Sequence, residues 1–136
     1  MAVLVLDASA VIALLDARDA HHAGATAELA AIESDELVLP ASAYSEALVA
    51  AYREGARAVA VVDGLLVQRG IRVHPVDGAI GRRAAELRAR HAGLRLPDAL
   101  VLATGDVLGA DAVLTADRAW LRVSKRARAI SRASLT

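Results

Sequence analysis

The chain has no cysteine and no phenylalanine among its 136 residues, and aromatic residues make up only 2% of it. The absence of cysteine excludes a disulfide framework and a thiolate-bound metal. Without phenylalanine, the hydrophobic 56% must build its core from Ala, Val, Leu and Ile, which suits helices packed closely on a sheet. We expect a single domain over residues 1–136, long enough to bury about two thirds of its unfolded surface.

Net charge is also lacking, because 16 basic and 16 acidic residues cancel, so the total does not indicate a polyanionic partner. The N-terminus has no basic flank and no cleavage site, and acidic residues from Asp7 onward interrupt it short of a membrane span. We therefore expect a soluble, cytoplasmic protein without membrane contact. Residues 118–136 carry basic side chains and no acid. These are Arg118, Arg122, Lys125, Arg126, Arg128 and Arg132.

Short apolar runs alternate with longer helical patterns along the chain. The runs at 2–6, 36–40, 71–75 and 111–115 predict buried strands, and a further short strand is predicted near 128–130. Helices are predicted over 11–15, 20–34, 43–54, 56–69, 78–91 and 98–108. Alternation of strands and helices favours an α/β fold with a mostly parallel sheet of four or five short strands.

Asp7 ends the first apolar run and is the only charge in residues 1–15. A lone carboxylate in apolar surroundings lowers stability unless something pairs with it or coordinates it, so a structural role would favour almost any other residue. Ser9 is the expected N-cap of the following helix, which places Asp7 in the turn at the carboxyl end of the strand. Ligands bind at that edge of open α/β sheets.

Three other acids share this setting. Glu46 is a lone charge on an apolar helix, Asp98 lies in the first turn of its helix, and Asp117 closes an apolar strand. Because strand ends and helix starts lie on one edge of a parallel sheet, we expect the four acids to converge. Crowded carboxylates repel one another unless a hard cation such as Mg²⁺ or Mn²⁺ neutralises them. Ser9 and Thr115 add hydroxyl groups beside two of the acids.

Other interpretations of these acids stay open. The helix dipole favours an acid in a first turn, so Asp98 alone fits a cap as well as a ligand. Asp106 and Asp111 also lie near the expected site, and we favour Asp117 because it ends a strand. If all four acids were caps and turn residues of an ordinary α/β domain, each isolated charge would lower stability with nothing to offset it.

Four short motifs, in this order, resemble those of the PIN-domain ribonucleases, and in particular the VapC-like toxins of bacterial toxin–antitoxin pairs. They are LDAS at 6–9, SEAL at 45–48, PDAL at 97–100 and LTAD at 114–117. The resemblance covers nearly the whole chain and implies a three-layer α/β/α PIN-like domain. Within it, Asp7, Glu46, Asp98 and Asp117 match the acidic quartet of the family, and Ser9 matches the small hydroxyl residue that follows the first acid.

The resemblance implies an endoribonuclease toxin that uses Mg²⁺ or Mn²⁺ to hydrolyse RNA phosphodiesters, leaving 5′-phosphate and 3′-hydroxyl ends. In that scheme Asp7 and Asp98 are the first-choice metal ligands, Glu46 is a ligand or orients the attacking water, and Asp117 completes the site. The basic residues of 118–136 and of the helix face at 82–90 would attract the RNA backbone in a salt-dependent way. The family also implies a homodimer and a small VapB-like antitoxin whose segment enters the acidic groove.

Two other functions are weighed against this one. A phosphotransferase of the haloacid dehalogenase type also ends its first strand in an aspartate, but Asp7-Ala8-Ser9 lacks a second acid two positions on. That class is further disfavoured because Lys125 is the only lysine. A catalytically silent PIN-like domain that binds RNA or a partner would be expected to lose one or more of the four acids, and all four are present.

Overall fold

In the computed structural model, residues 2–31 and 36–133 are described, and their strands form one sheet in the order β3-β2-β1-β4-β5. Every neighbouring pair of strands in it is parallel. The strands are β1 (Val3–Leu6), β2 (Glu36–Pro40), β3 (Ile71–His74), β4 (Ala112–Thr115) and β5 (Ala127–Ala129). The predicted α/β class and its parallel sheet of short strands are confirmed.

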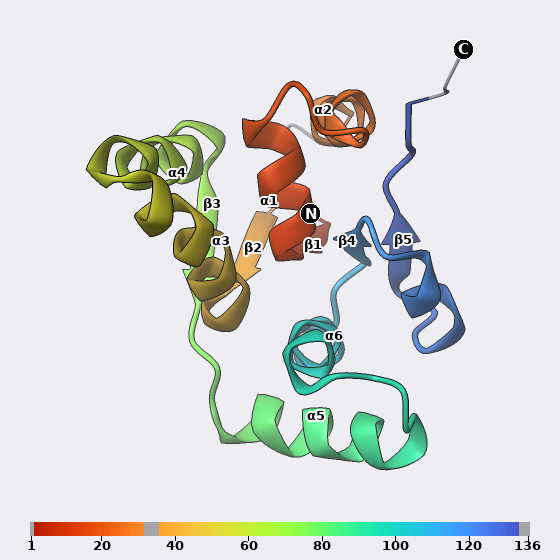
Figure 1. Cartoon of the computed structure of the whole chain (residues 1–136). Coiled ribbons are helices and arrows are strands. Elements are labelled where there is room, and N and C mark those ends of the chain that lie inside the picture. The colour runs from red at the N-terminus through yellow and green to blue at the C-terminus, as the bar shows by residue number, and fades with distance from the viewer. Residues whose placement is uncertain (1, 32–35, 134–136) are drawn as a thin grey trace.

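Helices connect the strands and cover both faces of the sheet (Figure 1). From β1 the chain moves outward to β2 and β3, and it then returns across the sheet to β4 and β5. Right-handed crossovers therefore place the helices before β3 on one face and those after it on the other. The first layer holds α1 (Ala8–Leu15), α2 (His22–Ala30), α3 (Ala41–Glu54) and α4 (Ala56–Arg69). The second holds α5 (Gly78–Arg90), α6 (Leu96–Leu108) and the 3₁₀ helix η1 (Arg118–Arg122).

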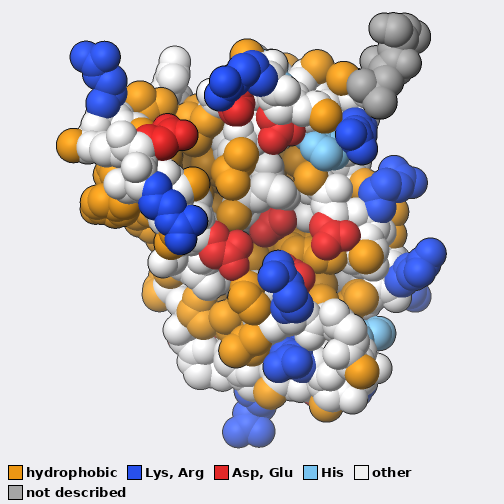
Figure 2. Space-filling view, viewed as in Figure 1, with side chains coloured by type: hydrophobic (Ala, Val, Ile, Leu, Met, Phe, Trp, Pro, Cys, Tyr) orange, Lys and Arg blue, Asp and Glu red, His pale blue; other side chains and the backbone are white. Residues whose placement is uncertain are grey.

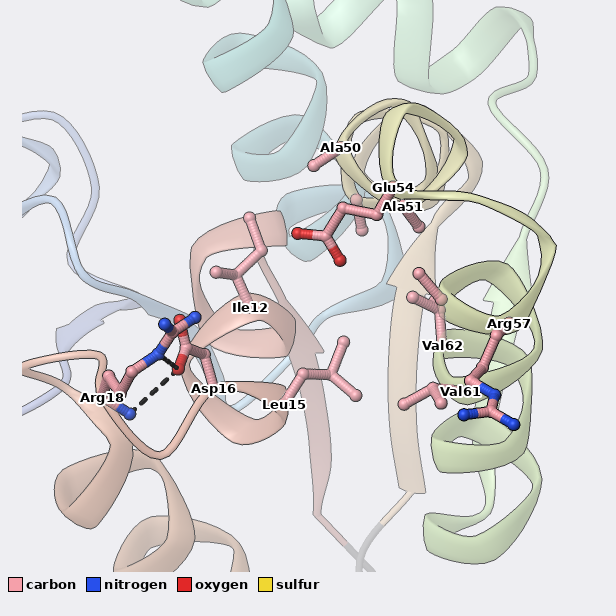
Figure 3. A pocket seen from close by; sticks show the side chains of 12 residues that line it. Ile12, Leu15, Asp16, Arg18, Ala50, Ala51, Glu54, Arg57, Val61 and Val62 are labelled. Carbon is pink, nitrogen blue, oxygen red and sulfur yellow. Dashed lines mark hydrogen bonds and ion pairs between the residues drawn. The ribbon is translucent and has the colours of Figure 1, made fainter.

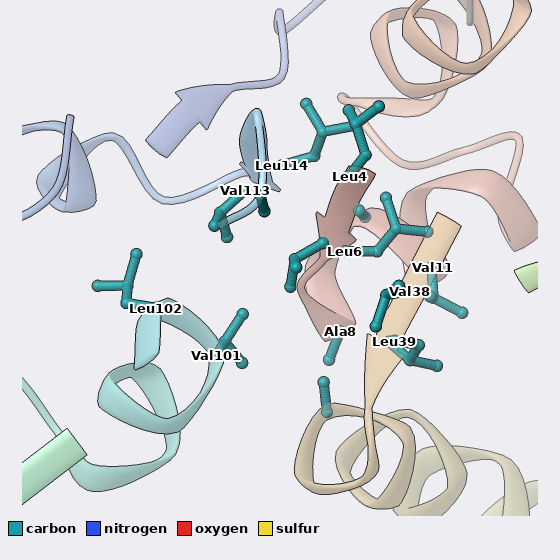
Figure 4. Close-up of a cluster of buried hydrophobic side chains, with 14 of the residues drawn as sticks. Leu4, Leu6, Ala8, Val11, Val38, Leu39, Val101, Leu102, Val113 and Leu114 are labelled. Carbon is teal, nitrogen blue, oxygen red and sulfur yellow. The ribbon is translucent and has the colours of Figure 1, made fainter. Parts of the chain in front are cut away.

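The core is aliphatic, as the composition predicts. Val5 and Leu6 of the central strand β1 have no exposed surface. Figure 4 shows side chains from α1, β2, α6 and β4 gathered around this strand. Because these side chains are short, helices on both faces pack closely against the sheet. Within the described residues, no helix is long and apolar enough to span a membrane.

The predicted starts of four helices, α1, α2, α3 and α6, differ from the observed ones. Asp7, not Ser9, is the N-cap of α1, because Asp7 has an extended backbone and its own carboxylate accepts the Ala8 N–H. Helix α3 begins at Ala41, directly after Pro40, so Ser42 lies inside the helix and does not cap it. For the helix predicted over 20–34, α2 accounts for His22–Ala30, and residues 32–34 lie outside the described part of the chain.

Helix α6 approaches β4 closely at Gly105. A Cβ built at this position would lie 2.5 Å from Val113 Cγ2, and both residues are buried in the core. Glycine is therefore needed here for space, since no side chain fits between the helix and the strand. The contact holds α6 against the sheet, and with it Asp98 in the first turn of that helix.

We expect Gly105→Ala to lower the free energy of unfolding by about 1–3 kcal/mol, because the added methyl group overpacks the α6–β4 contact. Chemical denaturation followed by circular dichroism measures this loss. Gly64→Ala is the matched control, since Gly64 lies on exposed α4 with no atom near the position of its Cβ. The control should be neutral or more stable by up to about 1 kcal/mol. Equal stability of the two variants would contradict the close packing at Gly105.

Candidate active site

Strand β1 is the switch point of the sheet. The strands β2 and β3 follow it on one side, and β4 and β5 lie on its other side. In open parallel sheets, ligands bind outside the carboxyl ends of the strands at such a switch point. Asp7 directly follows β1, and Asp117 follows β4 after one intervening residue. Leu6 pairs with Leu114 in the register of these two strands, so the two carboxylates emerge at the same edge of the sheet.

A cavity of about 450 Å³ lies at this edge, and Asp7, Glu46, Asp98 and Asp117 all line it. Figure 2 shows acidic side chains gathered near the centre of this face of the molecule. Glu46 comes from α3 and Asp98 from the first turn of α6. The structure thus brings together the four acids predicted from the sequence. The other lining residues are Ala8, Ser9, Ile12, Arg95, Ala116 and Trp120.

Three hydrogen bonds fix the carboxylate of Asp7. Its Oδ1 accepts the backbone N–H of Ala8 at 2.8 Å. Its Oδ2 accepts the hydroxyls of Ser9 at 2.7 Å and of Thr115 at 3.0 Å. Asp7 is only 8% exposed and Thr115 is fully buried, so these bonds form in a largely desolvated setting.

The same two hydroxyls also hold the loop after β4. Ser9 Oγ accepts the N–H of Ala116 at 3.0 Å, and Thr115 Oγ1 accepts the N–H of Asp117 at 3.1 Å. Each hydroxyl therefore bridges the Asp7 carboxylate to the backbone that carries Asp117. This gives Ser9 and Thr115 a physical role beside the acids, which is to lock the ends of β1 and β4 together.

Burial and crowding raise the pKa of three of the acids. Desolvation raises the pKa of Asp7, although its hydrogen bonds act in the opposite direction. Desolvation is also the main cause of the raised pKa of Glu46 and of Asp98, and the negative charge of Asp7 adds to both. Arg95 opposes these shifts from 3.5 Å away, measured from its Nε to Asp98 Oδ2. The cavity therefore carries more negative charge than this arginine neutralises.

Glu46 is more exposed than the sequence predicts. The apolar residues that flank it on α3 suggested an apolar setting, but the helix buries Ala43, Ala47 and Ala51 instead. Glu46 lies beside this buried stripe and faces the cavity. Sequence periodicity identified the helix but not the side of it that meets solvent.

Asp106 and Asp111, the two acids that were alternatives to Asp117, lie outside the cavity. Asp106 forms ion pairs with Arg83 at 2.8 Å and with Arg126 at 3.2 Å. Asp111 accepts the N–H of Val3 at 2.8 Å, which is at the amino end of β1. Neither lines the acidic cavity.

Sequence reasoning missed one charged residue of the cavity, Arg95. The only signal was its position three residues before Asp98, in the loop that precedes the helix. Trp120 is buried, with 3% of its surface exposed, and it also lines the cavity.

The donor chemistry of the cavity suits a divalent cation. Carboxylate oxygens are the ligands that Mg²⁺ and Mn²⁺ prefer, and a cation would neutralise the charge that burial and the neighbouring carboxylates disfavour. Across residues 2–31 and 36–133, no three His, Asp or Glu side chains are already arranged as a ligand set. The carboxylates therefore surround the cavity without forming a finished coordination shell.

An apolar groove of about 500 Å³ adjoins the acidic cavity. Figure 3 shows Ile12 and Leu15 of α1 facing Val61 and Val62 of α4, with α3 at one end of the groove. Ile12 lines both hollows, so the groove and the cavity share a wall. Charged residues of the groove are Asp16, Arg18, Glu54 and Arg57.

Comparison with solved structures identifies the fold. VapBC2 from Rickettsia felis, bound to a DNA fragment from its promoter, matches with a TM-score of 0.79 at 12% identity, over 95% of this chain and 99% of that one. A toxin–antitoxin complex from Klebsiella pneumoniae matches with a TM-score of 0.74 at 18% identity, over 95% and 98% of the two chains. Mycobacterium tuberculosis VapC20, a sarcin-ricin loop cleaving toxin, matches with a TM-score of 0.67 at 24% identity, over 81% and 86%.

Comparison at the level of sequence gives the family. No curated protein matches the chain. The family model described as the PIN domain matches residues 4–126. This range contains all four acids of the cavity and the sheet apart from Val3 and the last strand, β5. This agrees with the resemblance seen in the four motifs. The chain belongs to the PIN domain family.

Proposed function

We propose that this protein is a metal-dependent endoribonuclease and the toxin of a toxin–antitoxin pair. The observation that carries the proposal is the convergence of four acids on one cavity at the switch point of a PIN-domain sheet. The similarity to VapC20, a toxin that cleaves the sarcin-ricin loop, supports RNA as the substrate class. We take residues 1–136 as a single catalytic domain that acts in the cytoplasm.

Asp7 and Asp98 are the candidate ligands for Mg²⁺ or Mn²⁺. Three hydrogen bonds orient Asp7, and the packing of α6 fixes the position from which Asp98 reaches the cavity. A divalent ion held there would supply Lewis acidity and positive charge at the phosphodiester. Asp117 is the fourth acid that lines the cavity, and the hydroxyls of Ser9 and Thr115 hold the Asp7 carboxylate in place.

Glu46 is the candidate for orienting the attacking water. Its side chain is exposed at the cavity, and burial together with the charges of Asp7 and Asp98 raises its pKa, the direction that favours uptake of a proton from water. In the proposed reaction the water oxygen bonds to phosphorus while the bond from phosphorus to the 3′-oxygen breaks. The departing oxygen takes a proton from solvent, which leaves a 3′-hydroxyl and a 5′-phosphate.

Basic residues beside the cavity would attract the RNA backbone. Arg118 and Arg122 lie on η1, which begins directly after Asp117, and both are exposed. Contacts from such residues to phosphates are sequence-independent and weaken as salt rises. They favour RNA binding without selecting a target sequence.

We also propose a VapB-like antitoxin as partner, and a homodimer as the assembly of the toxin. The Rickettsia felis and Klebsiella pneumoniae neighbours were solved in toxin–antitoxin complexes. The apolar groove between α1, α3 and α4 suits the apolar face of a partner helix, with charged residues at hand for its polar edge. Because Ile12 borders both hollows, a segment leaving the groove would reach the acidic cavity.

The alternative is a catalytically silent PIN-like domain that binds RNA or a partner. Cleavage assays on purified protein distinguish this function from that of a nuclease.

We expect the purified protein to cleave structured RNA only when Mg²⁺ or Mn²⁺ is added. Asp7→Asn and Asp98→Asn should each lower the cleavage rate by more than about 100-fold, because each removes a candidate ligand and keeps the side-chain shape. Glu86→Gln, an exposed acid on α5 outside the cavity, is the control and should cleave normally. Cleavage that survives EDTA and both substitutions would rule out the proposed chemistry, and a wild type that binds RNA without cutting it would favour the silent domain.

In EDTA at neutral pH, Asp7→Asn should raise the thermal midpoint by a few degrees, since it removes a charge that burial disfavours. The folded pKa of Asp7 exceeds the ordinary value of 3.8. Below 3.8 the carboxyl group is protonated in both the folded and the unfolded state, so no buried charge destabilises the folded protein. As the pH rises through the folded pKa, the buried charge forms and the folded state loses stability. The advantage of the variant should therefore vanish in acid. Thermal unfolding across pH measures this, and added Mg²⁺ should stabilise the wild type more than the variant. A pH-independent difference would show that the charge of Asp7 is not its cause.

Expression in a bacterial host should slow growth, and co-expression of the small reading frame that flanks the gene should relieve the effect. Val61→Glu places a charge in the apolar groove at an exposed position on α4, a helix that carries none of the four acids, so cleavage should persist while neutralisation fails. Growth curves and RNA cleavage are measured on the same variants. Full neutralisation of Val61→Glu would exclude the groove as the docking site, and a harmless wild type would remove the toxin assignment.

A further inference from the structure

Arg95 is the one basic residue among the described residues that line the acidic cavity. Its Nε lies 3.5 Å from Asp98 Oδ2, and its side chain is 75% exposed, whereas that of Asp98 is 18% exposed. The charge of Arg95 acts on Glu46 as well as on Asp98. A largely solvated cation thus faces the acids that we propose as metal ligands.

The backbone of Arg95 is held by hydrogen bonds at the start of α6, whereas its side chain is largely exposed. Its carbonyl accepts the N–H of Ala99 at 2.9 Å, which closes the first turn of α6. The preceding residue, Leu94, is buried, and its carbonyl accepts Arg88 Nε at 2.9 Å. The guanidinium can therefore change partners by side-chain rotation alone, without any change in the fold.

A single exposed ion pair at 3.5 Å is weak. Such pairs form and break readily because solvent screens them and holding the long side chain lowers its entropy. A divalent ion carries twice the charge of a guanidinium, so it competes favourably for the same carboxylate. Once a divalent ion binds Asp98, the guanidinium of Arg95 has no carboxylate partner there and its N–H donors face the mouth of the cavity. A phosphate matches those donors in geometry and charge.

We propose that Arg95 is a displaceable counter-cation of the acidic cavity. While no divalent ion is bound, its guanidinium pairs with Asp98. When an ion takes Asp98, the guanidinium turns outward and contacts an RNA phosphate at the mouth of the cavity. This inference rests on the proposed function and adds to it a residue that senses metal occupancy and helps to position the RNA.

Two binding measurements test the inference without cleavage. Mn²⁺ binding to the RNA-free protein is measured by calorimetry for the wild type, Arg95→Ala and Arg95→Lys. Arg72→Ala is the matched control, because Arg72 is an exposed arginine of β3 paired with Glu36 at 2.6 Å outside the cavity. Removing the competing cation should tighten Mn²⁺ binding by about two- to fivefold, the range of one exposed ion pair. Arg95→Lys should stay near the wild type, and the control should not change.

RNA binding gives the second measurement, by fluorescence anisotropy of a short single-stranded RNA with Ca²⁺ as the divalent ion and a gel to verify that the RNA stays intact. Arg95→Ala should weaken this binding several-fold and reduce its salt slope by about 0.7, the share of one phosphate contact. The loss should be smaller in EDTA, where Arg95 is held by Asp98. Opposite changes in metal and RNA affinity are not expected from a merely structural residue, and circular dichroism verifies that the fold is intact.

The outcomes separate this inference from the proposed function. Mn²⁺ binding that is equal in the wild type and in Arg95→Ala overturns the counter-cation role while the metal site stands. RNA binding that Arg95→Ala weakens equally with and without Ca²⁺ also overturns it. If the wild type binds no Mn²⁺, or if Asp98→Asn binds it as well as the wild type does, the proposed metal site fails and this inference fails with it.

Discussion

The carboxylate of Asp7 joins the carboxyl ends of two neighbouring strands. Burial disfavours its charge, yet the Ser9 and Thr115 hydroxyls and the Ala8 N–H all converge on it. Those hydroxyls in turn hold the backbone of Ala116 and Asp117, so the end of β1 and the loop after β4 form one hydrogen-bonded unit. A charge held this firmly in a desolvated place costs stability, and such positions are typical of groups that act on a ligand.

The order of the strands decides where the other acids meet this unit. With β1 between β2 and β4, the chain leaves β1 in one direction and returns on the other face, so α3 and the start of α6 approach the same edge. Glu46 and Asp98 come to the cavity by that route. A core of short aliphatic side chains permits the close helix packing that this requires, most tightly where α6 meets β4 at Gly105.

The balance of charge links the cavity to its surroundings. Four acids and one exposed arginine line it, and three of the acids have raised pKa values. A cation, a basic segment of a partner and Arg95 are therefore competitors for the same carboxylates. The apolar groove beside the cavity adds an apolar surface to the same face, and because Ile12 lines both hollows, a partner bound in the groove would lie next to the acids. RNA would meet the same face from the side of η1 and its arginines.

The sequence by itself determined the elements and the chemical types at the site. Helix α4 has the predicted bounds, the strands β1 to β4 lie within the predicted runs or match them, and β5 lies within two residues of its prediction. These features follow from periodicity and from turn residues, which are local along the chain. The four motifs also singled out the acids that line the cavity, and their catalytic roles stay a prediction.

Only the tertiary structure decided which side chain meets which. It made Asp7 the helix cap in place of Ser9, turned Glu46 toward the cavity and away from the apolar core, and brought Arg95 onto Asp98. It also separated Asp106 and Asp111 from the cavity by giving them other partners. The physical reason is that the direction and solvation of a side chain depend on the packing of elements distant in the chain, which no local pattern of residues encodes.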